Sequence, residues 1–66
     1  MDVVINGQAR TVPEGETIPG LLESLGLAEE RVAVELDGKI VRRGDWRGRE
    51  LRPGSRVEIV HFVGGG

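Results

Sequence analysis

The sequence predicts a small α+β domain in which one helix packs on one face of a mixed sheet of four to five strands. Three observations support this class: a strong hairpin signal near the N-terminus, one short amphipathic helix, and three further strand-like runs. The expected order is strand, strand, helix, strand, strand, strand. With 66 residues, the chain has room for only one hydrophobic core.

Residues 1–12 are predicted to form the hairpin. Val3 and Ile5 alternate with polar neighbours, and Asn6-Gly7 is typical of a two-residue turn that needs positive φ at both positions. Residues 8–12 then form the return strand. Val4 interrupts the alternation, so it is an apolar residue on the expected outer face.

Residues 18–25 are predicted to form the helix. Thr17 is suited to the N-cap, and Gly26 is suited to the position just past the C-terminal end. The apolar residues of this segment recur at helical spacing along one face: Ile18, Leu21, Leu22 and Leu25. A helix this short is stable only when that face packs on the sheet.

Residues 32–36 and 39–41 read as two strands joined by a tight turn at Asp37-Gly38. Residues 42–52 lack periodicity, and Trp46 is expected to cover one end of the core. Residues 56–62 form the last strand, which is central if it pairs with the first. Val57 and Ile59 are expected on its inner face.

Composition excludes several function classes. There are no cysteines and one histidine, so disulfides, a thiol nucleophile and a Cys/His metal site are excluded, and we predict no metal. The net charge of −2 argues against nucleic-acid binding. Apolar runs of at most three residues predict no membrane span, and the start resembles no leader peptide, so we expect a cytoplasmic protein.

Charge is divided unevenly along the chain. Residues 1–37 carry eight acidic and two basic side chains, whereas residues 38–66 carry seven basic and three acidic ones. Six arginines account for most of the basic half: Arg42, Arg43, Arg47, Arg49, Arg52 and Arg56. Because Asp45 and Glu50 interrupt them and only Trp46 is available for stacking, we interpret them as a solvated rim. His61 is interpreted as a surface or partly packed residue.

Taken together, these blocks resemble the ThiS-type sulfur-carrier family of thiamin (thiazole) biosynthesis, a ubiquitin-like β-grasp family. The resemblance spans the whole chain, from Val3-Val4-Ile5-Asn6-Gly7 to the glycine run at the end. Between them it includes Pro13-Glu14-Gly15-Glu16-Thr17, residues 21–25, residues 32–41, Trp46 and residues 53–60. Where two terminal glycines are the usual minimum, this chain has three.

The resemblance implies a protein cosubstrate and not an enzyme. A ubiquitin-activating-type adenylyltransferase would use ATP to adenylate the carboxylate of Gly66, and a cysteine desulfurase system would supply sulfur. The resulting thiocarboxylate would deliver that sulfur to thiazole synthase. No cofactor is bound by the carrier itself, because ATP is consumed by the partner enzyme.

The glycine run suits this chemistry on physical grounds as well. A carboxylate is a poor electrophile until it is activated, and glycine provides a thin chain that enters a narrow site. We therefore divide the chain into a domain of residues 1–62 and a flexible tail of residues 63–66, with Gly64 and Gly65 threading into the partner. Val60 and Phe62 share a strand face with Glu58, so we predict that they dock the partner and that Val4 extends the patch.

Two other functions use the same features. The small subunit of molybdopterin synthase has the same tail chemistry, although it is typically longer. A non-covalent ubiquitin-like binding module would use the surface alone and leave the tail inert. A self-contained enzyme is disfavoured, because no nucleophile, base and acid set is evident in the sequence.

Overall fold

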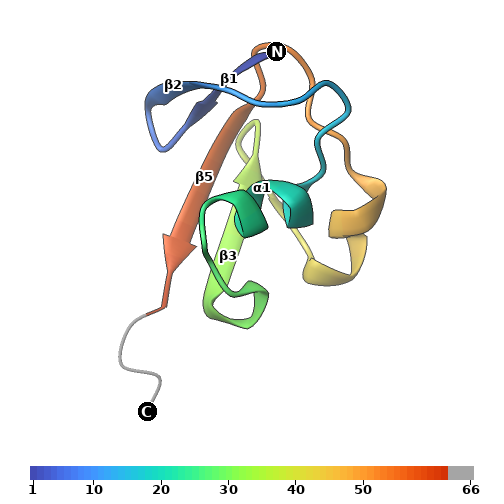
Figure 1. The fold of residues 1–66 in the computed structure, drawn as a ribbon. Coiled ribbons are helices and arrows are strands. Elements are labelled where there is room, and N and C mark those ends of the chain that lie inside the picture. Colours follow the sequence, from blue (N-terminus) through green and yellow to red (C-terminus); the bar gives the residue numbers. More distant parts are fainter. Residues whose placement is uncertain (63–66) are drawn as a thin grey trace.

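The computed structural model describes residues 1–62, which fold into one sheet and one α-helix (Figure 1). The strands are β1 (Asp2–Ile5), β2 (Gln8–Thr11), β3 (Val32–Leu36), β4 (Lys39–Val41) and β5 (Arg56–His61). The helix α1 spans Ile18–Ser24, and two 3₁₀ helices, η1 (Glu29–Arg31) and η2 (Arg43–Gly48), lie in the connections. Within residues 1–62, the longest helix is much too short to cross a bilayer.

The five strands form a single mixed sheet in the order β2-β1-β5-β3-β4. β5 lies between β1, to which it is parallel, and β3, to which it is antiparallel. The two hairpins, β1–β2 and β3–β4, complete the sheet on either side. The predicted order and the central position of the last strand are confirmed, and α1 covers one face of the sheet (Figure 1).

Both predicted hairpin turns adopt the left-handed backbone that their residues favour. Asn6 and Gly7 have φ values of 49° and 80°, and Asp37 and Gly38 have values of 52° and 85°. Two consecutive residues with positive φ match the right-handed twist of the flanking strands. The register of each hairpin, and therefore which side chains face the helix, follows from these turns.

The helix begins and ends where the sequence indicates, within one residue. The Thr17 hydroxyl accepts a hydrogen bond from the Gly20 backbone N–H at 3.2 Å, which caps the N-terminus. Leu25 is the C-cap residue and Gly26 follows with φ of 72°. The last residue of the predicted helix is therefore a half-buried cap, packed against the edge of the core.

The core fills the space between α1, η2 and the inner face of the sheet. Trp46 is an interior residue and not the cover that the sequence suggested, since only 1% of it is exposed. Its indole N–H donates to the Val41 carbonyl at 2.8 Å, which satisfies the buried polar atom. The buried apolar set is Val3, Ile5, Val12, Ile18, Leu21, Leu22, Val32, Val34, Val41, Trp46, Leu51 and Val57.

Candidate functional site

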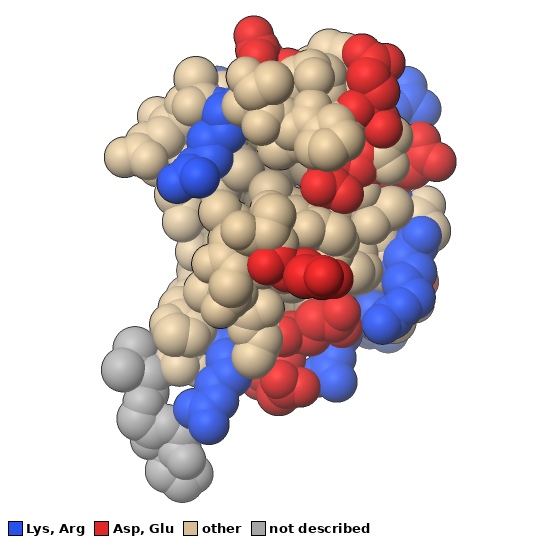
Figure 2. Space-filling view, in the orientation of Figure 1, with Lys and Arg blue, Asp and Glu red and all other residues tan. Residues whose placement is uncertain are grey.

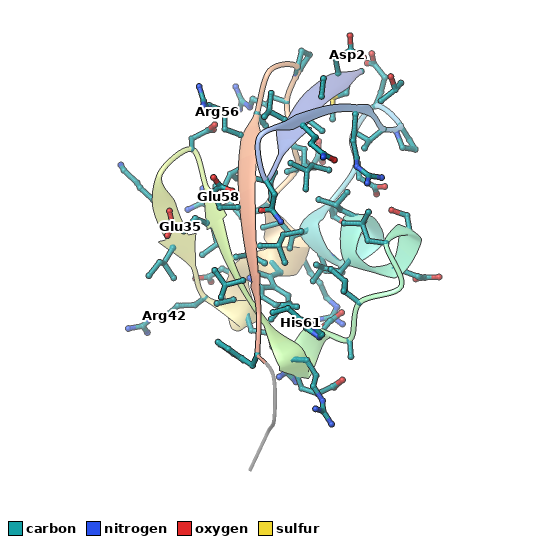
Figure 3. The ribbon with its side chains drawn as sticks, turned by 90° about the vertical axis from the view of Figure 1, so that its left-hand side faces the viewer. Asp2, Glu35, Arg42, Arg56, Glu58 and His61 are labelled. Atoms are coloured by element: carbon teal, nitrogen blue, oxygen red, sulfur yellow. The ribbon has the colours of Figure 1, made fainter. Side chains whose placement is uncertain are left out.

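The site is built on the outer face of the sheet, where β5 reaches the end of the described chain. Val60 is 55% exposed and Phe62 is 51% exposed, and both follow Glu58 at every second position of the strand. Glu58 lies on the side of the sheet opposite α1 (Figure 3). The prediction that Val60 and Phe62 face solvent is confirmed.

Phe62 is held beside β3 by a backbone contact. Its N–H donates to the Arg31 carbonyl at 2.7 Å, which continues the antiparallel pairing one position beyond His61. In the sequence, only Val63 separates Phe62 from the glycine run. Gly66, the residue predicted to be adenylated, and Gly64 and Gly65, predicted to thread into the partner, lie outside the described residues.

Ile40 belongs to the same outer face, and sequence reasoning missed it. It is 76% exposed and lies opposite Glu35 in β3, which in turn lies opposite Glu58 in β5. The segment Lys39-Ile40-Val41 is too short to show an alternation of polar and apolar residues, so the sequence pattern does not indicate which face of the sheet Ile40 occupies. The signal was available only through the Asp37-Gly38 turn, which sets the register of β4.

Val4 shares this face but lies at the other end of it. The parallel register places Val4 beside Arg56, four positions before Val60 along β5. At the rise of an extended strand, that separation is about 13 Å. Val4 is also half-buried, so it is not contiguous with the cluster around Val60 and Phe62.

Asn6 fixes the part of β5 that precedes Val60. The Ile59 backbone N–H donates to Asn6 Oδ1 at 2.7 Å, and Asn6 Nδ2 donates to the Ile59 carbonyl at 3.3 Å. The backbone pairing of β1 with β5 ends at Ile5 and Val57. Beyond that point, the Asn6 side-chain amide supplies the hydrogen bonds that a paired backbone would have made to Ile59. This contact joins residues 53 positions apart in the chain and supports the strand that carries the exposed apolar cluster.

The arginine-rich stretch is exposed, as the interpretation of a solvated rim requires. All six of its arginines have exposed side chains. The ion pair found within residues 1–62 joins Arg47 to Glu29 at 3.6 Å. On the face seen in Figure 2, acidic and basic side chains are interleaved and form no continuous basic surface. That arrangement does not suit a polyanion.

A separate hollow of about 470 Å³ lies at the far end of β5. Arg49 and Arg52 contribute to its wall, together with Asp37 and Glu50, so its charges are balanced. It is remote from Phe62, at the other end of the strand. Among residues 1–62, no three His, Cys, Asp or Glu side chains are grouped as metal ligands would be, and His61 is exposed at the end of β5.

The sequence profile of the ThiS family matches residues 3–66, which includes the glycine run. The chain belongs to the ThiS family. A crystal structure of the thiamine biosynthesis protein ThiS from Geobacter metallireducens covers the whole of both chains with a TM-score of 0.85 and 35% identity. A solution structure from the same organism gives a TM-score of 0.79 at 35% identity, covering this chain fully and 88% of the other. The expected β-grasp fold is confirmed.

Curated relatives fall into two kinds. Thiazole synthases from Magnetococcus marinus and Paramagnetospirillum magneticum are 41% and 38% identical over 66 residues, and the chain spans only 20% of each. The sulfur carrier protein ThiS of Escherichia coli is 27% identical, and the match covers both chains completely. The ThiS-like region therefore occurs both as a separate small protein and as part of a protein named thiazole synthase.

Proposed function

We propose that this chain is a sulfur carrier that serves formation of the thiazole moiety of thiamin. The observation that carries the proposal is the family match, which extends through the glycine run to Gly66. The full-length similarity to a sulfur carrier protein supports the same function. The relatives named for thiazole synthesis favour this pathway over molybdopterin synthesis.

In this proposal the chain is acted upon and has no active site of its own. A ubiquitin-activating-type adenylyltransferase converts the Gly66 carboxylate into an acyl-adenylate with ATP, since the carboxylate needs a leaving group before sulfur can replace oxygen. A cysteine desulfurase system supplies the sulfur, and the thiocarboxylate then donates it to thiazole synthase. We place these partners and the carrier in the cytoplasm, with no resident cofactor on the carrier.

The exposed cluster gives the first partner a surface to bind. Val60 lies on β5 and Phe62 directly follows the strand, with Val63 alone before the glycine run, so docking there brings the tail to the partner's active site. Burying two half-exposed apolar side chains offsets part of the entropy lost when a glycine tail is ordered. The domain thus supplies affinity and the tail supplies reactivity.

The test is the intact mass of the 66-residue chain after incubation with ATP, the adenylyltransferase and the desulfurase system. We expect the increase that corresponds to replacement of one oxygen by sulfur, and none without ATP. If the unaltered chain is never adenylated by such an enzyme, the carrier function is wrong.

A tail variant sharpens this test. Gly65→Val should fold normally but lose most thiocarboxylate formation, because a β-branched side chain restricts the backbone and widens the tail. Gly44→Val is the matched control: a Cβ at Gly44 has no atom within 4 Å, and the site lies in η2, away from the tail. Normal modification of the Gly65→Val chain would contradict the narrow-channel argument.

A further inference from the structure

The three exposed large apolar side chains in the described part of the molecule all lie on one face of the sheet. Ile40 is 76% exposed, and Val60 and Phe62 are 55% and 51% exposed. Ile40 lies on the edge strand β4, whereas Val60 lies on β5 and Phe62 directly follows β5, so strand β3 separates them. An apolar cluster that the chain itself leaves uncovered is typical of a protein-binding surface.

Two carboxylates lie at the centre of this half of the face. Glu35 and Glu58 are directly opposite one another in the β3–β5 register, and Ile40 follows in the same row on β4. Figure 3 shows both carboxylates on the same side of the sheet. Like charges at directly opposite positions destabilise an antiparallel pair. The fold gains nothing from this pair.

Within residues 1–62, neither Glu35 nor Glu58 forms an ion pair. The ion pair of this part of the chain joins Arg47 and Glu29, on the other side of the molecule's core. Arg42 and Arg56 lie toward the same face (Figure 3), but neither forms an ion pair with Glu35 or Glu58. The carboxylates are therefore available to a cation from another molecule.

We infer that this face is the docking surface for thiazole synthase, and that an arginine or lysine of the synthase enters between Glu35 and Glu58. The inference rests on the proposed function. Ile40 lies beside Glu35, and Val60 lies two positions after Glu58 on the same face. A partner docked here would cover these apolar side chains together with the carboxylates and exclude water, which strengthens a charge-assisted hydrogen bond. A pair of carboxylates without such a cation would oppose burial, so the face discriminates against partners that lack it.

Thiazole synthase is the occupant because two relatives of this chain carry a matching region within proteins of that name. When the carrier region is covalently linked to the synthase, its effective concentration at the synthase is high. A separate carrier must instead bind the synthase through a surface of its own. Because only Val63 separates Phe62 from the glycine run, a synthase docked here also receives the tail.

The experiment measures the affinity of the fluorescently labelled, unmodified 66-residue chain for thiazole synthase from the same organism. The double variant Glu35→Gln with Glu58→Gln should bind roughly tenfold more weakly, and its affinity should depend less on salt. Its melting temperature should stay the same or rise, because a like-charge contact is removed. Glu14→Gln with Glu23→Gln is the control: it makes the same change in net charge at two exposed acids elsewhere, and should bind as the unaltered chain does.

Three results would overturn the inference. The Glu35/Glu58 variant could bind the synthase as tightly as the Glu14/Glu23 control, or melt several degrees lower, which would assign the carboxylates to the fold. It could also lose adenylation while keeping synthase affinity, which would assign the face to the adenylyltransferase alone. In each case a thiocarboxylate formed on the unaltered chain would leave the proposed function standing, whereas its absence would remove that function separately.

Discussion

The two faces of the sheet differ in what covers them. On the inner face Val3, Val34 and Val57 are each 1% exposed, because α1 and η2 pack against them. On the outer face Ile40 and Val60 are more than half exposed, although they belong to the same sheet. The chain buries the apolar side chains of the inner face by itself, and the exposed apolar side chains of the outer face remain available to a partner.

β5 separates the two roles by alternation. Val57 points into the core, whereas Glu58 and Val60 point to the outer face. Substitutions at one parity should therefore change the free energy of unfolding, and substitutions at the other should change partner affinity.

Leu22→Ala should destabilise the domain by about 2–5 kcal/mol, because it leaves a cavity beneath the helix. Leu22 is fully buried between α1 and the sheet. Such a loss is a large part of the stability of a small domain, so thermal or urea unfolding will show it clearly. A neutral result would mean that this face of α1 does not pack as described. Leu25→Ala, at the half-buried cap, should cost less.

Phe62→Ala should leave the melting temperature nearly unchanged and weaken adenylation by roughly tenfold in KM, as expected for an exposed aromatic anchor at an interface. The measurement is ATP–pyrophosphate exchange at varied carrier concentration with the adenylyltransferase. An unchanged kcat at saturating carrier would separate docking from chemistry. If KM is unaffected, Phe62 is not part of the surface that this enzyme binds.

Much of this division could be predicted from the sequence. Asn6-Gly7 and Asp37-Gly38 each fix a two-residue turn by local backbone preference, and the spacing of Leu21 and Leu22 fixes the face of the helix. These signals are local. The alternation of Val57 and Ile59 with Glu58 is a further local signal, and it gives the exposure of Val60 and Phe62.

The remainder depended on contacts between distant segments. Trp46 lies in a stretch without periodicity, so only the folded path of η2 shows that it is a core residue. The separation of Val4 from Val60 follows from the parallel register, whereas the exposure of Ile40 follows from the nearby Asp37-Gly38 turn that sets the register of β4. The Glu35–Glu58 contact arises only once β3 and β5 are aligned.

Asn6→Gly tests a contact that supports both faces at once. Glycine keeps the positive φ of the turn but removes the amide that bonds to Ile59, so we expect a loss of about 1 kcal/mol. Hydrogen exchange of the Ile59 backbone amide should accelerate more than that of the Val57 amide, because Val57 lies before the Asn6–Ile59 hydrogen bonds. Equal acceleration at both amides would show that these hydrogen bonds have no local effect on β5.

Ile40→Thr and Val41→Thr compare the two faces at adjacent positions of one strand. Ile40 is 76% exposed, so its replacement by another β-branched residue should change stability by no more than about 0.5 kcal/mol. Val41 is 6% exposed, and its replacement buries a hydroxyl in an apolar site, which should cost about 1–3 kcal/mol. Affinity for thiazole synthase should show the opposite order once both proteins are folded, with Ile40→Thr the weaker binder. If Ile40→Thr destabilises the domain as much as Val41→Thr does, the outer face is part of the core and the division between the two faces fails.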